Sequence, residues 1–282
     1  GDQEFQAGST DISNNLGAGA YLYSMYSPDK DISIEMDLYG GKGADNSGNA
    51  GGEGGFSRIR FTMLRNVEYV IAGLTDSVQT PYIYRKATLI ANVGKGGDAG
   101  ERGRGGFGGG VNNPGENAPG RDGGQTRTSP VRSTNEEFGS LTSLPTGIGG
   151  NPRAQYRKAV TPNAGMVAPC SRGIYYRDQG VSACDDVGSS VKFRWSDGTE
   201  ISNTASITRG YKAGLNYIQT AGKKETSSSG NGGNGAKGGQ GGSNGYGGAG
   251  GGGYQDGSIT VESTQLGGST FDDAKVILRV VT

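Results

Sequence analysis

Glycine recurs with a period of three in one tract of this chain, and no other feature constrains the fold as strongly. Between Gly230 and Gly253 the sequence divides into the triplets GNG, GNG, AKG, GQG, GSN, GYG, GAG and GGG. Glycine fills the first and the third position in seven of these eight triplets, and the middle position is mostly polar. A second tract, from Gly94 to Gly110, has glycine at the start of every triplet, and a weaker one runs from Gly40 to Gly55.

A period of three is the repeat of the extended left-handed polyproline-II helix, which has no hydrogen bonds within itself. Two of its three faces here would carry glycine alone, so neighbouring helices could approach closely on both. Their backbone N–H and C=O groups would pair between helices, because buried unpaired groups are costly. The tracts therefore predict a packed polyglycine-II lattice. We expect its structural glycines to include Gly94, Gly97, Gly100, Gly103, Gly232, Gly235, Gly238, Gly239, Gly241 and Gly247.

A flexible linker and a collagen helix are the alternatives to the lattice. A Gly/Ser linker needs no fixed phase, and collagen needs long runs with much proline, which 230–253 lacks. Twenty-four straight residues would span ~75 Å, too far for a compact domain. The phase slips at Asn244, and Ser243-Asn244-Gly245 suits a turn. We therefore expect two passes with a reversal near Asn244.

Outside the tracts, alternating apolar residues indicate β-strands. Residues 31–39 place Ile32, Ile34, Met36 and Leu38 on one face of a half-buried strand. No long stretch has the 3.6-residue period of a helix. Further strands are predicted over 56–63, 67–74, 82–93, 191–195, 200–208, 258–262 and 275–281.

The predicted fold class is all-β, with small β layers, packed polyglycine-II helices, long irregular loops and essentially no α-helix. Glycine tracts begin where strands end, at Tyr39, Val93 and Thr220, so the lattice should extend from the end of a β layer. We divide the chain into 1–110, a Pro-rich irregular excursion over 111–169, and 170–282. The last part is expected to fold as one unit with the first.

The composition argues against several classes of function. None of the 282 residues is histidine, which excludes Ser-His-Asp and Cys-His nucleophile systems and His-ligated metal sites. The 27 basic and 27 acidic residues cancel, so no long-range attraction to nucleic acid or anionic membrane is expected. No stretch approaches the ~18 apolar residues of a membrane span. We expect a protein that is not an enzyme, with no catalytic residues, no cofactor and no metal.

Loop aromatics and arginine are the candidate binding residues, because such side chains are typical anchors of binding surfaces. For each of them, local packing against the glycine layer is the alternative. Cys170 and Cys184 would close a loop of about 15 residues as a disulfide, or remain free thiols. The candidate receptor-binding residues are Phe107, Tyr175, Tyr176, Arg177 and Tyr246.

The C-terminal part resembles a known family. The segments SDGTEISNTASITRGYKAGLNYIQTAG (Ser196 to Gly222), GGNGAKGGQGGSNGYGGAGGGGYQDGSITVESTQLGGST (Gly232 to Thr270) and AKVILR (Ala274 to Arg279) are similar to glycine-rich virion structural proteins of marine cyanophages. The resemblance covers about residue 191 to the end, and the N-terminal half matches in pattern alone. The alternation of strands and glycine tracts resembles glycine-rich domains of phage tail proteins, including polyglycine-helix adhesins at the fibre tips of some T-even-like phages.

These resemblances imply a virion component, and the tip adhesins imply loops at the ends of polyglycine helices that contact a receptor. We expect a tail-fibre or fibre-tip adhesin, located in the extracellular virion and used for host attachment. Its expected partners are other virion proteins, a host-surface glycan or protein, and further copies of itself as a homo-oligomer, with no nucleic acid and no membrane span. The alternatives are a capsid decoration or tail accessory protein and an extracellular bacterial surface or filament protein.

Overall fold

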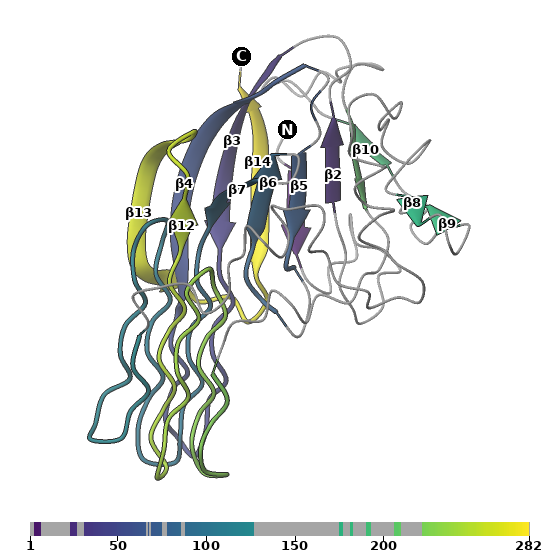
Figure 1. Ribbon diagram of the computed structural model, residues 1–282. Coiled ribbons are helices and arrows are strands. Elements are labelled where there is room, and N and C mark those ends of the chain that lie inside the picture. The colour runs from purple at the N-terminus through teal and green to yellow at the C-terminus, as the bar shows by residue number, and fades with distance from the viewer. Residues whose placement is uncertain are drawn as a thin grey trace.

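The computed structural model describes most of the glycine tracts and their flanking strands. The described residues are 3–6, 23–26, 31–65, 67, 69–74, 78–85, 88–126, 175–176, 181–182, 190–192, 206–209 and 222–281. They contain no helix and form antiparallel β-sheets, two of them large, from which a lattice of extended glycine-rich passes projects (Figure 1). The predicted all-β fold class is confirmed.

The first sheet has five strands in the order β1-β14-β3-β4-β13. Its centre is the hairpin-like pair β3 and β4, whose lower ends continue directly into the lattice (Figure 1). The last strand of the chain, β14, inserts between β1 and β3 and pairs with both. The strand bounds are Gln3–Gln6 for β1, Ile32–Tyr39 for β3, Gly54–Met63 for β4, Thr260–Ser269 for β13 and Lys275–Val281 for β14.

The second sheet has seven strands in the order β10-β11-β2-β5-β6-β7-β12, and β8 pairs with β9 separately. One prediction is wrong here: 82–93 is not a single strand. Residue pairing such as Ile83 with Ala91 shows two antiparallel strands, β6 and β7, in place of one continuous strand. The bounds are Tyr23–Tyr26 (β2), Tyr69–Ala72 (β5), Tyr82–Arg85 (β6), Thr88–Asn92 (β7), Tyr175–Tyr176 (β8), Val181–Ser182 (β9), Ser190–Lys192 (β10), Ser206–Arg209 (β11) and Tyr254–Gln255 (β12).

The two large sheets pack face to face around an apolar core. The alternation in β3 turns its apolar side chains inward, as predicted, and they are almost fully buried. Phe61 of β4 stacks on Tyr69 of β5, with 5.5 Å between ring centroids, which ties the sheets together. The other core residues include Ile32, Ile34, Met36, Leu38, Ile59, Met63, Ile71, Ile83, Ile90, Val276 and Leu278.

The outer face of the five-stranded sheet carries a network of ion pairs. Arg58 Nε lies 2.7 Å from Asp37 Oδ1, and Arg279 Nη2 lies 2.8 Å from Asp37 Oδ2. Arg60 and Arg279 both bond Glu35. The polar face of β3 is therefore buried as well, because arginines from the neighbouring strands lie over its carboxylates.

Below the sheets, the glycine-rich segments run alternately away from the sheets and back toward them. We call each extended segment between two reversals a pass. Residues 40–45 lead down from β3 and 50–55 lead back into β4, while 93–99 lead down from β7 and 246–253 lead back into β12 (Figure 1). The lattice therefore extends from the ends of β3 and β7, as predicted, while the third expected strand end, Thr220, lies outside the described residues. The remaining passes are 104–110, 113–118, 123–126, 222–225, 229–235 and 238–242.

Hydrogen bonds between the passes recur every third residue, which is the signature of polyglycine-II packing. In the pass 246–253, the N–H groups of Gly248 and Gly251 donate to Asp98 and Lys95 of one neighbour. Their carbonyls accept from the glycines of another neighbour, again three residues apart. This pass is central, since it bonds 93–99, 104–110, 113–118, 123–126, 229–235 and 238–242.

Close approach explains why these positions are glycine. At Gly94, for example, an added Cβ would lie less than 3.0 Å from the carbonyl oxygen of Gly251 in the central pass, closer than real Cβ atoms come. Gly103 is the exception among the predicted structural glycines, since its Cβ would meet nothing nearer than 3.6 Å. Gly238 is buried. The same close approach to backbone oxygen holds at Gly97, Gly100, Gly232, Gly235, Gly239, Gly241 and Gly247.

The predicted reversal at Asn244 is present, and the structure adds a second one within 230–253. The chain also turns at Ala236 and Lys237, where the triplet AKG lacks its first glycine. Both reversals therefore fall where the glycine phase breaks. Residues 111–126, from the segment predicted as an excursion, supply two of the passes, 113–118 and 123–126.

Candidate functional site

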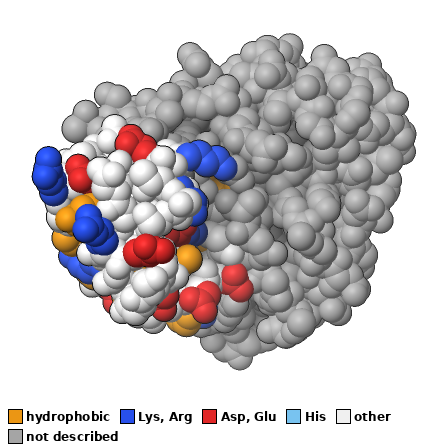
Figure 2. Space-filling model, turned by 90° about the horizontal axis from the view of Figure 1, so that it is seen from below, with side chains coloured by type: hydrophobic (Ala, Val, Ile, Leu, Met, Phe, Trp, Pro, Cys, Tyr) orange, Lys and Arg blue, Asp and Glu red, His pale blue; other side chains and the backbone are white. Residues whose placement is uncertain are grey.

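The far end of the lattice is a surface built from chain reversals, which we call the tip surface. It lies at the opposite end of the lattice from the sheets (Figure 1). Seen end-on, it shows acidic and basic side chains scattered among backbone and small polar groups (Figure 2). The tip surface comprises the turns 46–49, 100–103, 119–122, 226–229 and 243–246.

Two of these turns have the left-handed backbone of tight hairpins. Ser47 and Gly48 have φ of 49° and 82°, and Asn244 and Gly245 have φ of 52° and 88°. Positive φ at both central residues is the type I′ arrangement, which favours Asn at the first position and Gly at the second. The dipeptide Asn244-Gly245 therefore encodes its turn directly.

Hydrogen bonds join the turns to one another. Asn49 Nδ2 donates to the carbonyls of Gly100 (3.1 Å) and Glu101 (3.0 Å) in the next turn. The N–H of Glu101 donates to Ser228 O at 2.9 Å, and that of Arg102 donates to Gly245 O at 2.8 Å.

The turn 243–246 is fixed to 119–122 as well. The N–H of Ser243 donates to Asp122 O at 3.0 Å, and Asn244 Nδ2 donates to Asp122 Oδ2 at 3.2 Å. Each turn is thereby held by its neighbours as well as by its own passes. The turns of the tip surface are thus joined into one hydrogen-bonded layer.

Tyr246 is the aromatic candidate that the structure places in the tip surface. The edge of its ring covers Gly120, where an added Cβ would lie less than 3.0 Å from Cε1 of Tyr246. A Cβ added at Gly103 would lie 3.6 Å from Cδ1 of the same ring. The ring is half-buried, so one part packs on the glycines while another part meets solvent. The ring of Tyr246 therefore packs against Gly103 and Gly120, which have no side chains to displace it.

Phe107 lies elsewhere, on the side of the lattice in the pass 104–110. Arg104 Cζ stands 4.9 Å from the centre of its ring, and Gly267 of β13 approaches the ring edge. Phe107 and Tyr246 are therefore not brought together. Tyr175 and Tyr176 form β8, but their side chains, together with Arg177, Cys170 and Cys184, lie outside the described residues.

Unpaired charges project from the tip surface. Arg102 and Arg121 are exposed, and within the described part of the chain their side chains have no hydrogen bond or ion pair. The aliphatic stem of Arg102 lies over Gly245. By contrast, Asp45 beside the first turn is engaged, since Lys42 Nζ at 2.6 Å and the N–H of Gly51 hold the pKa of its carboxyl below the ordinary value.

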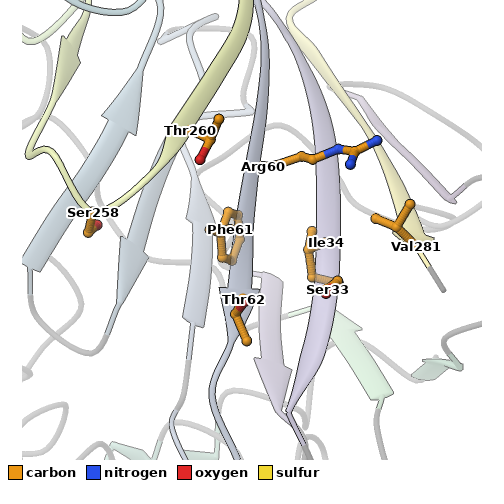
Figure 3. A pocket seen from close by; sticks show the side chains of 8 residues that line it. All are labelled: Ser33, Ile34, Arg60, Phe61, Thr62, Ser258, Thr260 and Val281. Atoms are coloured by element: carbon orange, nitrogen blue, oxygen red, sulfur yellow. The ribbon is translucent and has the colours of Figure 1, made fainter.

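A cavity of about 370 Å³ lies far from the tip surface, among the strand ends at the opposite end of the sandwich (Figure 3). Arg60 is the charged residue of its lining, and it is already paired with Glu35 at 3.0 Å and Glu262 at 2.7 Å. The cavity is therefore a mostly neutral, polar hollow. Its lining residues are Ser33, Ile34, Arg60, Phe61, Thr62, Ser258, Thr260 and Val281.

Among the described residues, no group of three or more Asp, Glu, Cys or His side chains is arranged to hold a metal ion. That part of the chain also has no helix of the length and apolarity that a membrane crossing requires. No protein-family model and no curated protein matches the chain.

Proposed function

We propose that this chain is a non-enzymatic structural protein of a phage virion, a tail-fibre or fibre-tip adhesin whose tip surface binds a host-surface glycan or protein. The resemblance of residues 196–222, 232–270 and 274–279 to glycine-rich virion proteins supports the virion setting. The tip surface supports the binding role. The chain would then act outside the cell, as part of the particle.

The observation that carries the proposal is the hydrogen bonding between the turns of the tip surface. Ordering a flexible loop on binding costs free energy, so loops that are already ordered bind with less loss. The passes behind the turns are bonded to neighbours on several sides, which keeps the base of each turn rigid. Loops also tolerate substitution better than the elements they join, which suits a surface that must follow a changing receptor.

The chemistry of the tip surface suits a glycan or a polar protein patch. The half-buried ring of Tyr246 can stack on the C–H face of a sugar. Arg102 and Arg121 offer free guanidinium groups that can bond a carboxylate or phosphate bidentately. These residues come from three different turns, so a ligand that contacts all of them must bind across several turns at once.

A competition assay tests this function. Purified, folded protein should bind host cells saturably and reduce adsorption of the phage. Tyr246→Ala should weaken both effects about tenfold, the loss expected of an aromatic anchor worth ~1.4 kcal/mol or more. Gln240→Ala is the matched control, because Gln240 is exposed on the side of the lattice, away from the tip surface.

The melting temperature of each variant must stay close to wild type, so that lost binding is not lost folding. If the folded wild-type protein neither binds cells nor competes, and imaging places it on the capsid wall or tail tube, it is a decoration or accessory protein. Binding that Tyr246→Ala leaves intact would keep the adhesin role and move its site away from this ring.

A further inference from the structure

Three Asn-Gly pairs lie in the last glycine tract, at 231–232, 234–235 and 244–245. In such a pair the glycine nitrogen can attack the side-chain carbonyl carbon of asparagine, because glycine has no side chain to obstruct it. A C–N bond forms and the side-chain nitrogen leaves as ammonia. Water then opens the cyclic imide to aspartate or isoaspartate, so water is the single co-reactant.

The lattice protects two of these pairs. Asn231 Oδ1 accepts a hydrogen bond from the N–H of Lys224 at 2.9 Å, and the N–H of Gly232 donates to Gly222 O at 2.9 Å. Asn234 is 6% exposed, and its Nδ2 donates to Val78 O at 3.0 Å. Ring closure at either site would require the pass 229–235 to leave its neighbours.

The third pair is held differently. Asn244 is exposed in the tip surface and open to water. The N–H of Gly245, the nitrogen that would attack, donates to Ser229 Oγ at 2.8 Å. Ser229 is 3% exposed, and its hydroxyl lies 2.5 Å from Thr226 Oγ1. One buried hydroxyl therefore restrains the reacting nitrogen.

We propose that Asn244 is the deamidation site of the folded protein and that Ser229 sets its rate. The nitrogen of Gly245 must lose its proton and leave Ser229 before it can reach the side chain of Asn244. This inference goes beyond the proposed function and does not depend on it.

Deamidation would alter the tip surface. Asn244 Nδ2 now donates to Asp122 Oδ2, and a carboxylate at position 244 would face that carboxylate and repel it. Isoaspartate would also add a backbone carbon to the turn that leads into Tyr246. The turns 243–246 and 119–122 would therefore separate.

The order of reaction in wild-type protein is the first test. The full chain is incubated folded, at mildly alkaline pH, and peptides are analysed by mass spectrometry for replacement of the amide by a carboxyl. Asn244 should be modified while Asn231 and Asn234 stay intact, whereas in denaturant all three should react at similar rates. Equal modification of Asn231 and Asn244 in the folded chain would overturn the proposal.

Variants of one turn test the role of Ser229. Ser229→Ala should accelerate modification of Asn244 about fivefold, the factor that corresponds to a lost hydrogen bond of ~1 kcal/mol. Ser228→Ala removes the same atom from the neighbouring residue and should leave the rate unchanged. Thr226→Ala loosens Ser229 but keeps its hydroxyl, so it should have less effect.

A Ser229→Ala rate equal to wild type, or a Thr226→Ala rate as high as Ser229→Ala, would overturn the role of Ser229. Melting temperatures show whether each variant is folded under the incubation conditions. If Ser229→Ala does not fold, the order of reaction in wild-type protein still decides whether Asn244 is the site.

Discussion

The sandwich and the lattice solve the problem of building an interior in opposite ways. In the sandwich, apolar side chains such as Ile34 and Met36 fill the space between two sheets. In the lattice there are almost no interior side chains, and backbone groups of neighbouring passes contact one another directly. The sandwich is held chiefly by removal of apolar surface from water, and the lattice chiefly by hydrogen bonds and close packing of the backbone.

The difference predicts which substitutions each region tolerates. A side-chain core loses stability when atoms are removed, because a cavity is left behind. A backbone core loses stability when atoms are added, because the neighbouring carbonyls cannot move without breaking hydrogen bonds. The sign of the volume change should therefore decide the outcome, and it should reverse between the two regions.

The largest effect is expected in the central pass. In Gly251→Ala the new Cβ would lie less than 3.0 Å from Asn234 O, while the N–H of Gly251 is bonded to Lys95 and its carbonyl to Gly109. We expect a loss of more than about 4 kcal/mol in the free energy of unfolding, measured by denaturant titration, or no folded protein at all.

Ala249→Gly is the matched control in the same pass. Ala249 is fully buried but occupies the middle position of its triplet, where a methyl group fits. Its removal should cost about 1 kcal/mol, the loss of one buried methyl group. If Gly251→Ala were as mild as Ala249→Gly, the lattice would not be a close-packed backbone core.

A smaller loss is expected from truncation in the sandwich. Ile34 is fully buried, so Ile34→Ala should lower the free energy of unfolding by about 3 kcal/mol. Ile34→Val, which removes a single methylene, should cost about 1 kcal/mol. An Ile34→Ala loss that matched Ile34→Val would argue against a tightly packed sandwich core.

The smallest expected effect is on the pH dependence of stability, and it concerns Asp37 in the sandwich. Burial alone would raise the pKa of Asp37, but hydrogen bonds and charge from Arg58 and Arg279 outweigh it and lower the pKa. A lowered pKa in the folded state adds stability above the ordinary Asp range near ~4, and this contribution is lost as pH falls through the folded-state value.

We therefore expect Asp37→Asn to lose about 1–2 kcal/mol at neutral pH and to show a weaker fall in stability on acidification than wild type. Thermal unfolding across the acid range measures this. Asp45→Asn is the comparison in the lattice, because solvent screens the exposed carboxyl of Asp45 and its removal should change stability less than Asp37→Asn does. Parallel pH profiles for wild type and Asp37→Asn would contradict the assignment.

The sequence predicted the lattice because each interior position there requires glycine, and the requirement repeats every third residue. It also predicted the reversal at Asn244, and the phase break at Ala236 coincides with a second turn that was not predicted. Glycine is likewise missing from the third triplet position at Ala99, directly before the turn 100–103, and at Arg102 within it. The strand β3 was also predictable from the sequence, because apolar and polar residues alternate along it without interruption.

Other features depend on distant partners and leave little local pattern. The pass 113–118 needs glycine mainly at Gly115, where it faces Gly250, so its period is hidden among Asn, Pro and Glu. The burial of Asp37 depends on Arg279, which is 242 residues away in sequence. The sequence indicates that Tyr246 is a loop aromatic. Its packing against Gly120 could not be predicted, because the two residues belong to separate turns.

The central position of 246–253 has a consequence for how the protein is made. The neighbours of this pass, from 93–99 to 238–242, all precede it in the chain, and β14, which fills the gap between β1 and β3, comes later still. Neither interior can close until residues 246–281, which include this pass and β14, have left the ribosome. Contacts this distant in sequence slow folding, so we expect nascent chains that end before residue 246 to remain sensitive to protease.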